Sequence, residues 1–147
     1  MPKFAVITGA SSGIGAEFAR QLSARGYELM LVARREERLR QLGAGLTTTC
    51  EIFPADLAKK SECLRLVKEL QGRRVDLFIN NAGFGDCGMF LDTDLDKELE
   101  MISVNVRALH ILTKQVARIL CRQGHGALLN VGSCEGLMPA GPYMATY

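Results

Sequence analysis

The segment with the clearest chemical meaning is residues 8–15, which reads TGASSGIG. Glycines at this spacing allow a tight turn and let a phosphate group approach the backbone. Free amides at the start of the following helix, together with the positive end of its dipole, favour an anion there. The segment therefore predicts a pyrophosphate-binding loop, although a glycine-rich turn without a ligand has the same composition. The residues expected to contact the ligand are Gly9, Ser11, Ser12, Gly13, Ile14 and Gly15.

Four further motifs follow this loop along the chain. They are Asp56-Leu57, Asn80-Asn81-Ala82-Gly83, Asn105 within Ser103-Val104-Asn105-Val106, and Asn130-Val131-Gly132-Ser133. Each motif is weak alone, but chance does not readily produce all five in this order, each at a matching strand or helix position. With these motifs the sequence resembles the short-chain dehydrogenase/reductase family over nearly its whole length.

The resemblance implies reversible hydride transfer between a nicotinamide cofactor and a small-molecule ketone or alcohol. In this family a tyrosine is the general acid/base, a serine orients the substrate oxygen and an asparagine holds a relay water. Ser133 and Asn105 match the last two roles. Such groups are needed because negative charge develops on the substrate oxygen. The resemblance also places Asp56, Leu57, Asn81, Ala82 and Gly83 at the cofactor.

The family's Y-x-x-x-K motif is only partly present. Tyr143 is followed four positions later by Tyr147 instead of lysine, whereas Tyr147 lies close to the family's usual separation from Ser133. We therefore assign the acid/base role to Tyr147, whose lysine would lie beyond the sequence. An unperturbed tyrosine has a pKa of about 10, so a chain without this lysine should be a poor enzyme. We expect one domain over residues 1–147, truncated at its C-terminus and lacking the family's last strands.

The choice between NADP and NAD is argued from Arg34, at the end of the expected second strand. An acidic residue there binds the ribose 2′-hydroxyl of NAD, whereas a basic residue favours the extra phosphate of NADP. Arg34 therefore predicts NADP over NAD, while Arg35 and Arg38 are interpreted as solvated residues of a charged helix. Asp56 would approach the adenine by resemblance, although alone it is equally well explained as the N-cap of the next helix.

The elements that position these residues follow a repeating strand-helix pattern. Unbroken apolar runs predict strands buried on both faces. The expected strands are 4–7, 29–32, 48–53, 77–79 and 127–131, and the expected helices are 13–25, 34–42, 59–71 and 95–122. Right-handed crossovers place a ligand crevice at the carboxyl ends of the strands. We expect an α/β fold of the Rossmann type, a doubly wound parallel sheet with strand order 3-2-1-4-5.

The helix expected over 95–122 carries an apolar stripe. Its members are Leu95, Leu99, Ile102, Val106, Leu109, Thr113, Val116 and Leu120. A stripe with this spacing most often packs on the sheet, but it also suits a subunit interface. The family resemblance suggests a homodimer or homotetramer formed through this helix.

Composition excludes several other classes of protein. The chain has 147 residues, 48% of them apolar, and a net charge of +2 with both signs mixed along its length. This composition excludes a disordered chain and offers no basic face for nucleic acid. We predict a cytoplasmic protein without a membrane span, since no apolar run approaches spanning length. Five cysteines without a C-x-x-C pair, and two separated histidines, predict reduced thiols and no metal site.

The leading hypothesis is an NADP-dependent oxidoreductase that interconverts a ketone and a secondary alcohol. The alternatives are a nucleotide-binding module without catalysis, and a dimerisation unit built on the helix over 95–122. Phe84, Met89 and Phe90 either line the mouth of a substrate pocket or, as is more common for apolar loop residues, pack against the fold.

Overall fold

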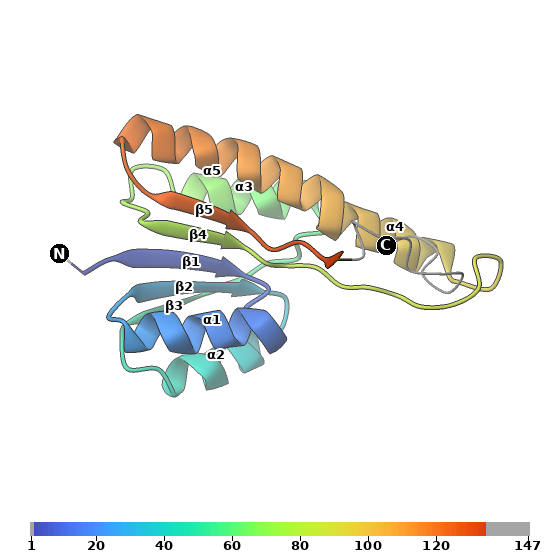
Figure 1. The fold of residues 1–147 in the computed structure, drawn as a ribbon, viewed down its shortest axis with the longest axis horizontal. Helices are drawn as coiled ribbons and strands as arrows, with labels where there is room; N and C mark the ends of the chain where they lie inside the picture. Colours follow the sequence, from blue (N-terminus) through green and yellow to red (C-terminus); the bar gives the residue numbers. More distant parts are fainter. Residues whose placement is uncertain (1, 135–147) are drawn as a thin grey trace.

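The computed structural model describes residues 2–134 and contains a five-stranded parallel sheet (Figure 1). The strands are β1 (Phe4–Thr8), β2 (Glu28–Ala33), β3 (Cys50–Pro54), β4 (Leu77–Asn80) and β5 (Ala127–Asn130). Their order across the sheet is β3-β2-β1-β4-β5, and each neighbouring pair is parallel. The predicted α/β class and strand order are therefore confirmed.

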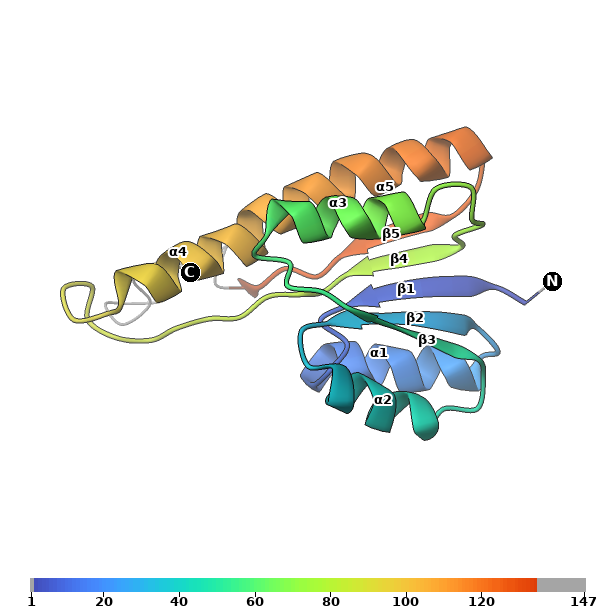
Figure 2. The same ribbon diagram turned by 180° about the vertical axis from the view of Figure 1, so that it is seen from behind.

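Helices cover both faces of the sheet. The helices α1 (Gly13–Ala24) and α2 (Glu36–Ala44) lie on one face, and α3 (Lys60–Glu69) and α5 (Leu109–Gln123) lie on the other (Figure 2). The sequence predicted that the second helix would end at Leu42, but α2 continues through Gly43 to Ala44. Gly43 faces β3: a Cβ built on it would lie in ordinary van der Waals contact with the Cys50 and Ile52 side chains, at 3.4 Å.

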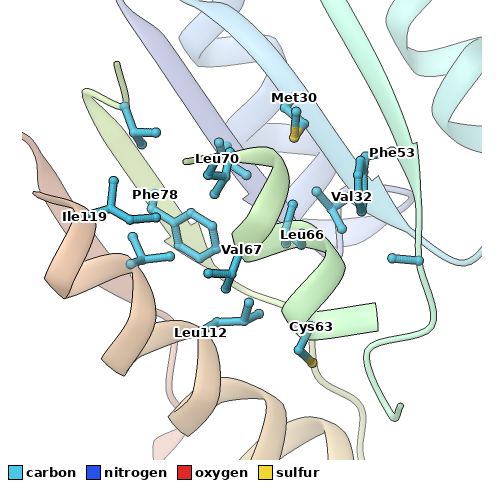
Figure 3. Packing of buried hydrophobic residues seen from close by; sticks show 14 of the residues in the cluster. Met30, Val32, Phe53, Cys63, Leu66, Val67, Leu70, Phe78, Leu112 and Ile119 are labelled. Carbon is cyan, nitrogen blue, oxygen red and sulfur yellow. The ribbon is translucent and has the colours of Figure 1, made fainter. Parts of the chain in front are cut away.

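Two hydrophobic clusters hold the layers together, one on each face. Every residue of β1 is buried, as an unbroken apolar run predicts for a central parallel strand. On the α3 and α5 face, Phe78 of β4 packs between side chains of both helices, among them Val67 and Ile119 (Figure 3). Cys63 is fully buried in this cluster as a small apolar residue, and none of the five cysteines forms a disulfide.

The expected helix over 95–122 is observed as three consecutive pieces. These are α4 (Leu95–Ile102), a π-helical turn η1 (Ser103–Ala108) and α5. The predicted apolar stripe does not pack on the sheet along its whole length: Leu99 and Val106 are 51% and 60% exposed, whereas Val116 is fully buried. The core prediction is thus wrong for the first half of the stripe, because the buried face of α4 and η1 is formed by other residues, among them Met101, Val104 and Ala108.

Among residues 2–134, no helix combines the length and the apolar character that crossing a membrane requires. Within the same residues, no three His, Cys, Asp or Glu side chains gather as a set of metal ligands.

Candidate active site

The predicted anion loop connects β1 to α1 at the carboxyl edge of the sheet. Gly9 has φ +68°, and a Cβ built on it would lie 2.8 Å from the Ala82 Cα, so only glycine fits. Gly15 is equally crowded, since its Cβ would lie 2.4 Å from the Gly9 carbonyl oxygen. Gly13 differs, because its φ is +55° and nothing lies within 4 Å of its Cβ position. The loop is therefore packed on its inner side and open at the start of α1.

The first turn of α1 has free hydrogen-bonding capacity. Its N-cap, Ser12, makes no side-chain capping bond, and no acidic residue lies in the turn. The first amides of a helix have no partner within the helix and carry the positive end of the dipole. An open glycine beside uncapped amides fits a phosphate group, so the loop residues suit the dinucleotide that the sequence predicts.

A buried threonine joins this loop to the segment after β4. The Thr8 hydroxyl accepts hydrogen bonds from the backbone amides of Asn81 at 2.9 Å and Ala82 at 3.0 Å. The Asn81 side chain in turn donates to the Thr8 carbonyl at 3.0 Å. Asn81, predicted to bind cofactor, thus directs its side chain to the loop backbone. Sequence reasoning missed the role of Thr8, whose only signal is a hydroxyl at the end of an apolar strand.

Two adjoining cavities lie along the carboxyl edge of the sheet. One has a volume of about 430 Å³ and the other about 490 Å³, and both are lined by Gly9, Ser12, Ala82, Gly83 and Phe84. They therefore form one groove that crosses the sheet at the anion loop. Phe84 belongs to this lining, whereas Met89 and Phe90 are 50% and 65% exposed, so the expectation that these two pack against the fold is wrong.

Two arginines occupy the first cavity. Arg34 Nη1 lies 2.5 Å from Oε1 of Glu100 in α4. Arg35 Nη2 donates to the hydroxyls of Ser11 at 3.0 Å and Ser12 at 2.9 Å. Arg35 is the N-cap of α2 and is exposed, in agreement with its interpretation as a solvated residue, but it also contacts the anion loop. The structure brings both cations to the predicted loop, and the sequence singled out only Arg34.

Asp56 and Leu57 also line the first cavity. The carboxylate of Asp56 accepts from the Ala58 amide at 3.2 Å and lies 3.7 Å from Lys59 Nζ. The N-cap of α3 is Lys59, so the alternative interpretation of Asp56 as the cap is wrong. Leu57 is buried in the core below the cavity.

The second cavity brings together Ile14, Asn105 and Ser133. Asn105 lies in the π-helical turn, where its Oδ1 accepts from the Phe84 amide at 3.1 Å and its Nδ2 donates to the Phe84 carbonyl at 2.7 Å. Both ends of this amide therefore fix the segment after β4. Ile14 is 62% exposed at the start of α1. Tyr147 and Tyr143 lie outside the described residues.

A polar chain supports the segment that carries Ser133. Buried Asn80 donates to the Leu109 carbonyl at 3.1 Å and to the Thr113 hydroxyl at 3.2 Å. Thr113 donates onward to Asn130 Oδ1 at 3.1 Å, three residues before Ser133. Thr113 was expected in an apolar stripe, but it connects α5 to the ends of β4 and β5. Its spacing gave no sign of this, because a threonine at a stripe position is indistinguishable from a core residue.

Comparison with known proteins agrees with this geometry. A very-long-chain 3-oxoacyl-CoA reductase of Neurospora crassa is 38% identical over an alignment 153 positions long, which covers 98% of this chain and 46% of that protein. The chain thus spans about half the length of this curated relative.

Solved structures give the same result. A short-chain dehydrogenase of Sphingobium yanoikuyae in complex with NADPH is 35% identical with a TM-score of 0.91, and the match covers 99% of this chain and 58% of that one. The bulky-bulky ketone specific alcohol dehydrogenase of Comamonas testosteroni is 32% identical with a TM-score of 0.91, and the match covers 100% of this chain and 60% of that one. A family model described as short chain dehydrogenase matches residues 3–147, and the chain therefore belongs to the short-chain dehydrogenase family.

Proposed function

We propose that this chain is the cofactor-binding part of an NADP-dependent oxidoreductase that interconverts a ketone and a secondary alcohol. One observation carries the proposal: a single groove has Arg34 and Arg35 at one end, the anion loop in its middle, and Asn105 with Ser133 at the other end. Cations, a phosphate cradle and a hydroxyl in this order match the successive chemical parts of a 2′-phosphorylated dinucleotide and a carbonyl substrate.

The cofactor is held by groups already in place. The open backbone at Gly13 and the first amides of α1 would take the pyrophosphate, and Asp56 would face the adenine. Arg34 would pair with the 2′-phosphate, which supports NADP over NAD. The Sphingobium relative, which binds NADPH, supports the same choice. Asn81, Ala82 and Gly83 form the floor of the groove between the two cavities.

When bound in this groove, NADPH would supply the hydride for reduction of the carbonyl carbon. The Ser133 hydroxyl would donate a hydrogen bond to the substrate oxygen and fix its position. Tyr147 would give its phenolic proton to that oxygen as negative charge develops there, so that an alcohol leaves. Asn105 acts on this arrangement through Phe84, whose backbone it holds on both sides. The substrate is proposed only as a ketone or secondary alcohol.

The cofactor loop is tested at Gly13, where space is open and φ is positive. Asparagine and aspartate both tolerate this backbone region and have the same shape. Gly13→Asp places a negative charge where the pyrophosphate is expected and should abolish NADPH binding, measured by fluorescence titration or calorimetry. Gly13→Asn is the matched control and should weaken binding much less. Equal binding of NADPH by the wild type and Gly13→Asp would exclude this loop as the phosphate site.

We also propose that the chain assembles as a homodimer or homotetramer through residues 95–122. The supporting observation is the row of large apolar side chains on α4 and η1 that the sheet does not cover. Leu95, Leu99, Ile102 and Val106 are each at least 42% exposed. These four residues are spaced four, three and four positions apart, and large apolar side chains that are exposed together mark an interaction site more often than ordinary surface.

A further inference from the structure

The two arginines at the end of the groove are held in different ways. Arg35 rests on two neutral hydroxyls, those of Ser11 and Ser12. Arg34 is held by a carboxylate, Glu100 of α4, at 2.5 Å. This ion pair connects the end of β2 to a helix on the other side of the groove, across 66 positions of the sequence. Both side chains remain accessible, with Arg34 59% and Glu100 38% exposed.

We propose that Glu100 is a specificity-determining residue, which competes with the 2′-phosphate of NADP for Arg34 and so limits the preference for NADP over NAD. The proposal rests on the function proposed above. It adds a residue that lies outside the cofactor loop and outside the lining of both cavities, and that acts through the guanidinium group it holds.

The competition follows from charge. A 2′-phosphate carries close to two negative charges and needs the guanidinium donors of Arg34 for a paired contact. If Arg34 turns to the phosphate, its bond to Glu100 is lost. If Arg34 stays paired with Glu100, its charge is already neutralised and a carboxylate stands beside the incoming phosphate. Both outcomes weaken binding of a 2′-phosphorylated ribose, and neither affects a ribose with a free 2′-hydroxyl.

Binding of a phosphate by Arg35 would break no ion pair. Its partners are uncharged, so exchanging them for phosphate oxygens separates no ion pair. The two arginines therefore have different roles. Arg35 holds the anion loop in place, and Arg34 binds the 2′-phosphate in competition with the Glu100 carboxylate. An exposed ion pair of this kind contributes modestly, so the preference should shift by about two- to fivefold when Glu100 is neutralised.

The test measures binding of 2′,5′-ADP and 5′-AMP to the purified chain by calorimetry. These probes report the adenosine end of the groove and need neither the nicotinamide half nor catalysis. Glu100→Gln should bind 2′,5′-ADP about two- to fivefold more tightly than the wild type, with 5′-AMP binding unchanged. Asp96→Asn removes the same charge one turn away on the same helix, where Asp96 is exposed, and should leave both affinities unchanged.

A double variant completes the experiment. If Glu100 acts through Arg34, Glu100→Gln should have little effect in an Arg34→Gln background. Unchanged or weaker 2′,5′-ADP binding by Glu100→Gln, or a gain that persists without Arg34, would overturn the inference while leaving the cofactor site intact. If the wild-type chain binds neither probe, the proposed function itself fails and the inference fails with it.

Discussion

At the scale of single residues, one buried hydroxyl determines how the two sides of the groove meet. Thr8 is fully buried, and its hydroxyl bonds the amides of Asn81 and Ala82 while donating to the Ile79 carbonyl at 3.3 Å. These amides follow β4, whereas Thr8 ends β1. The phosphate loop and the groove floor are therefore aligned by a side chain that contacts neither cavity.

This arrangement predicts the effect of Thr8→Val. Valine has the shape of threonine but cannot accept a hydrogen bond, so the partly buried amides of Asn81 and Ala82 lose their acceptor. We expect the free energy of unfolding in urea to fall by about 2–4 kcal/mol. Thr8→Ser is the matched control: it keeps the acceptor, removes one methyl group, and should lose about 1 kcal/mol. Equal losses in the two variants would show that packing of the methyl group, and not the hydroxyl, stabilises this junction.

Residue identities in the groove were predictable where backbone conformation dictates them. Gly9 and Gly15 are required because a Cβ would collide with neighbouring backbone, and a glycine pattern reports this directly. Arg35 was not predictable in the same way. Its hydrogen bonds to Ser11 and Ser12 span more than twenty positions and depend on where β2 ends relative to the loop. Side-chain partners brought together by the sheet leave no local signal in the sequence.

At the scale of elements, the strands were easier to predict than the long helix. Parallel strands buried on both faces require continuous apolar runs, and β1 and β2 have them. The helix over 95–122 has a regular apolar spacing, but the π-helical turn Ser103–Ala108 changes the number of residues per turn in its middle. A stripe extrapolated across this turn therefore changes face: Val116 and Leu120 are buried beyond the turn, whereas Leu99 is exposed before it.

The pairing of β1 with β4 depends on Asp76. Its Oδ2 accepts from the Phe4 amide at 2.9 Å, and Arg74 contacts Oδ1 at 2.8 Å, with the side chain only 10% exposed. Burial opposes ionisation of this carboxyl, but the hydrogen bonds from Arg74 and Phe4 outweigh it and hold the pKa of Asp76 below its ordinary value. The ionised form is therefore favoured by folding, and its contribution to stability is present at neutral pH.

The pH dependence expected for Asp76→Asn follows from the lowered pKa of Asp76. A carboxyl with a lowered pKa stabilises the fold above its unfolded pKa of about 3.9, and the contribution disappears as the pH falls through the folded value. Asp76→Asn should lower the free energy of unfolding by about 1–3 kcal/mol at pH 7, and the difference from wild type should shrink below about pH 4. Urea unfolding at several pH values measures it. Exposed Asp92 has no such partners, so Asp92→Asn is the control; a pH-independent loss in Asp76→Asn would refute the electrostatic explanation.

At the scale of the whole molecule, two surfaces of the described structure could support association. One is the free edge of β5, which has four residues and one large exposed apolar side chain, Leu129 at 41%. The other is the apolar face of α4 and η1, which carries four such side chains. A short edge strand offers few unpaired backbone groups, whereas an apolar helical face buries area in proportion to its side chains. The helical face should therefore dominate self-association.

This comparison gives the last prediction, tested by sedimentation equilibrium of the purified chain. Leu99→Glu combined with Val106→Glu puts charge into the helical face and should shift the chain to a monomer, because burying unpaired carboxylates is strongly unfavourable. Leu64→Glu changes a similarly exposed residue on α3 and should leave the assembly unchanged. Leu129→Lys tests the other surface directly. If Leu129→Lys alone gave a monomer while the α4 variant still associated, the β5 edge would be the interface, and the exposed half of the apolar stripe would need another explanation.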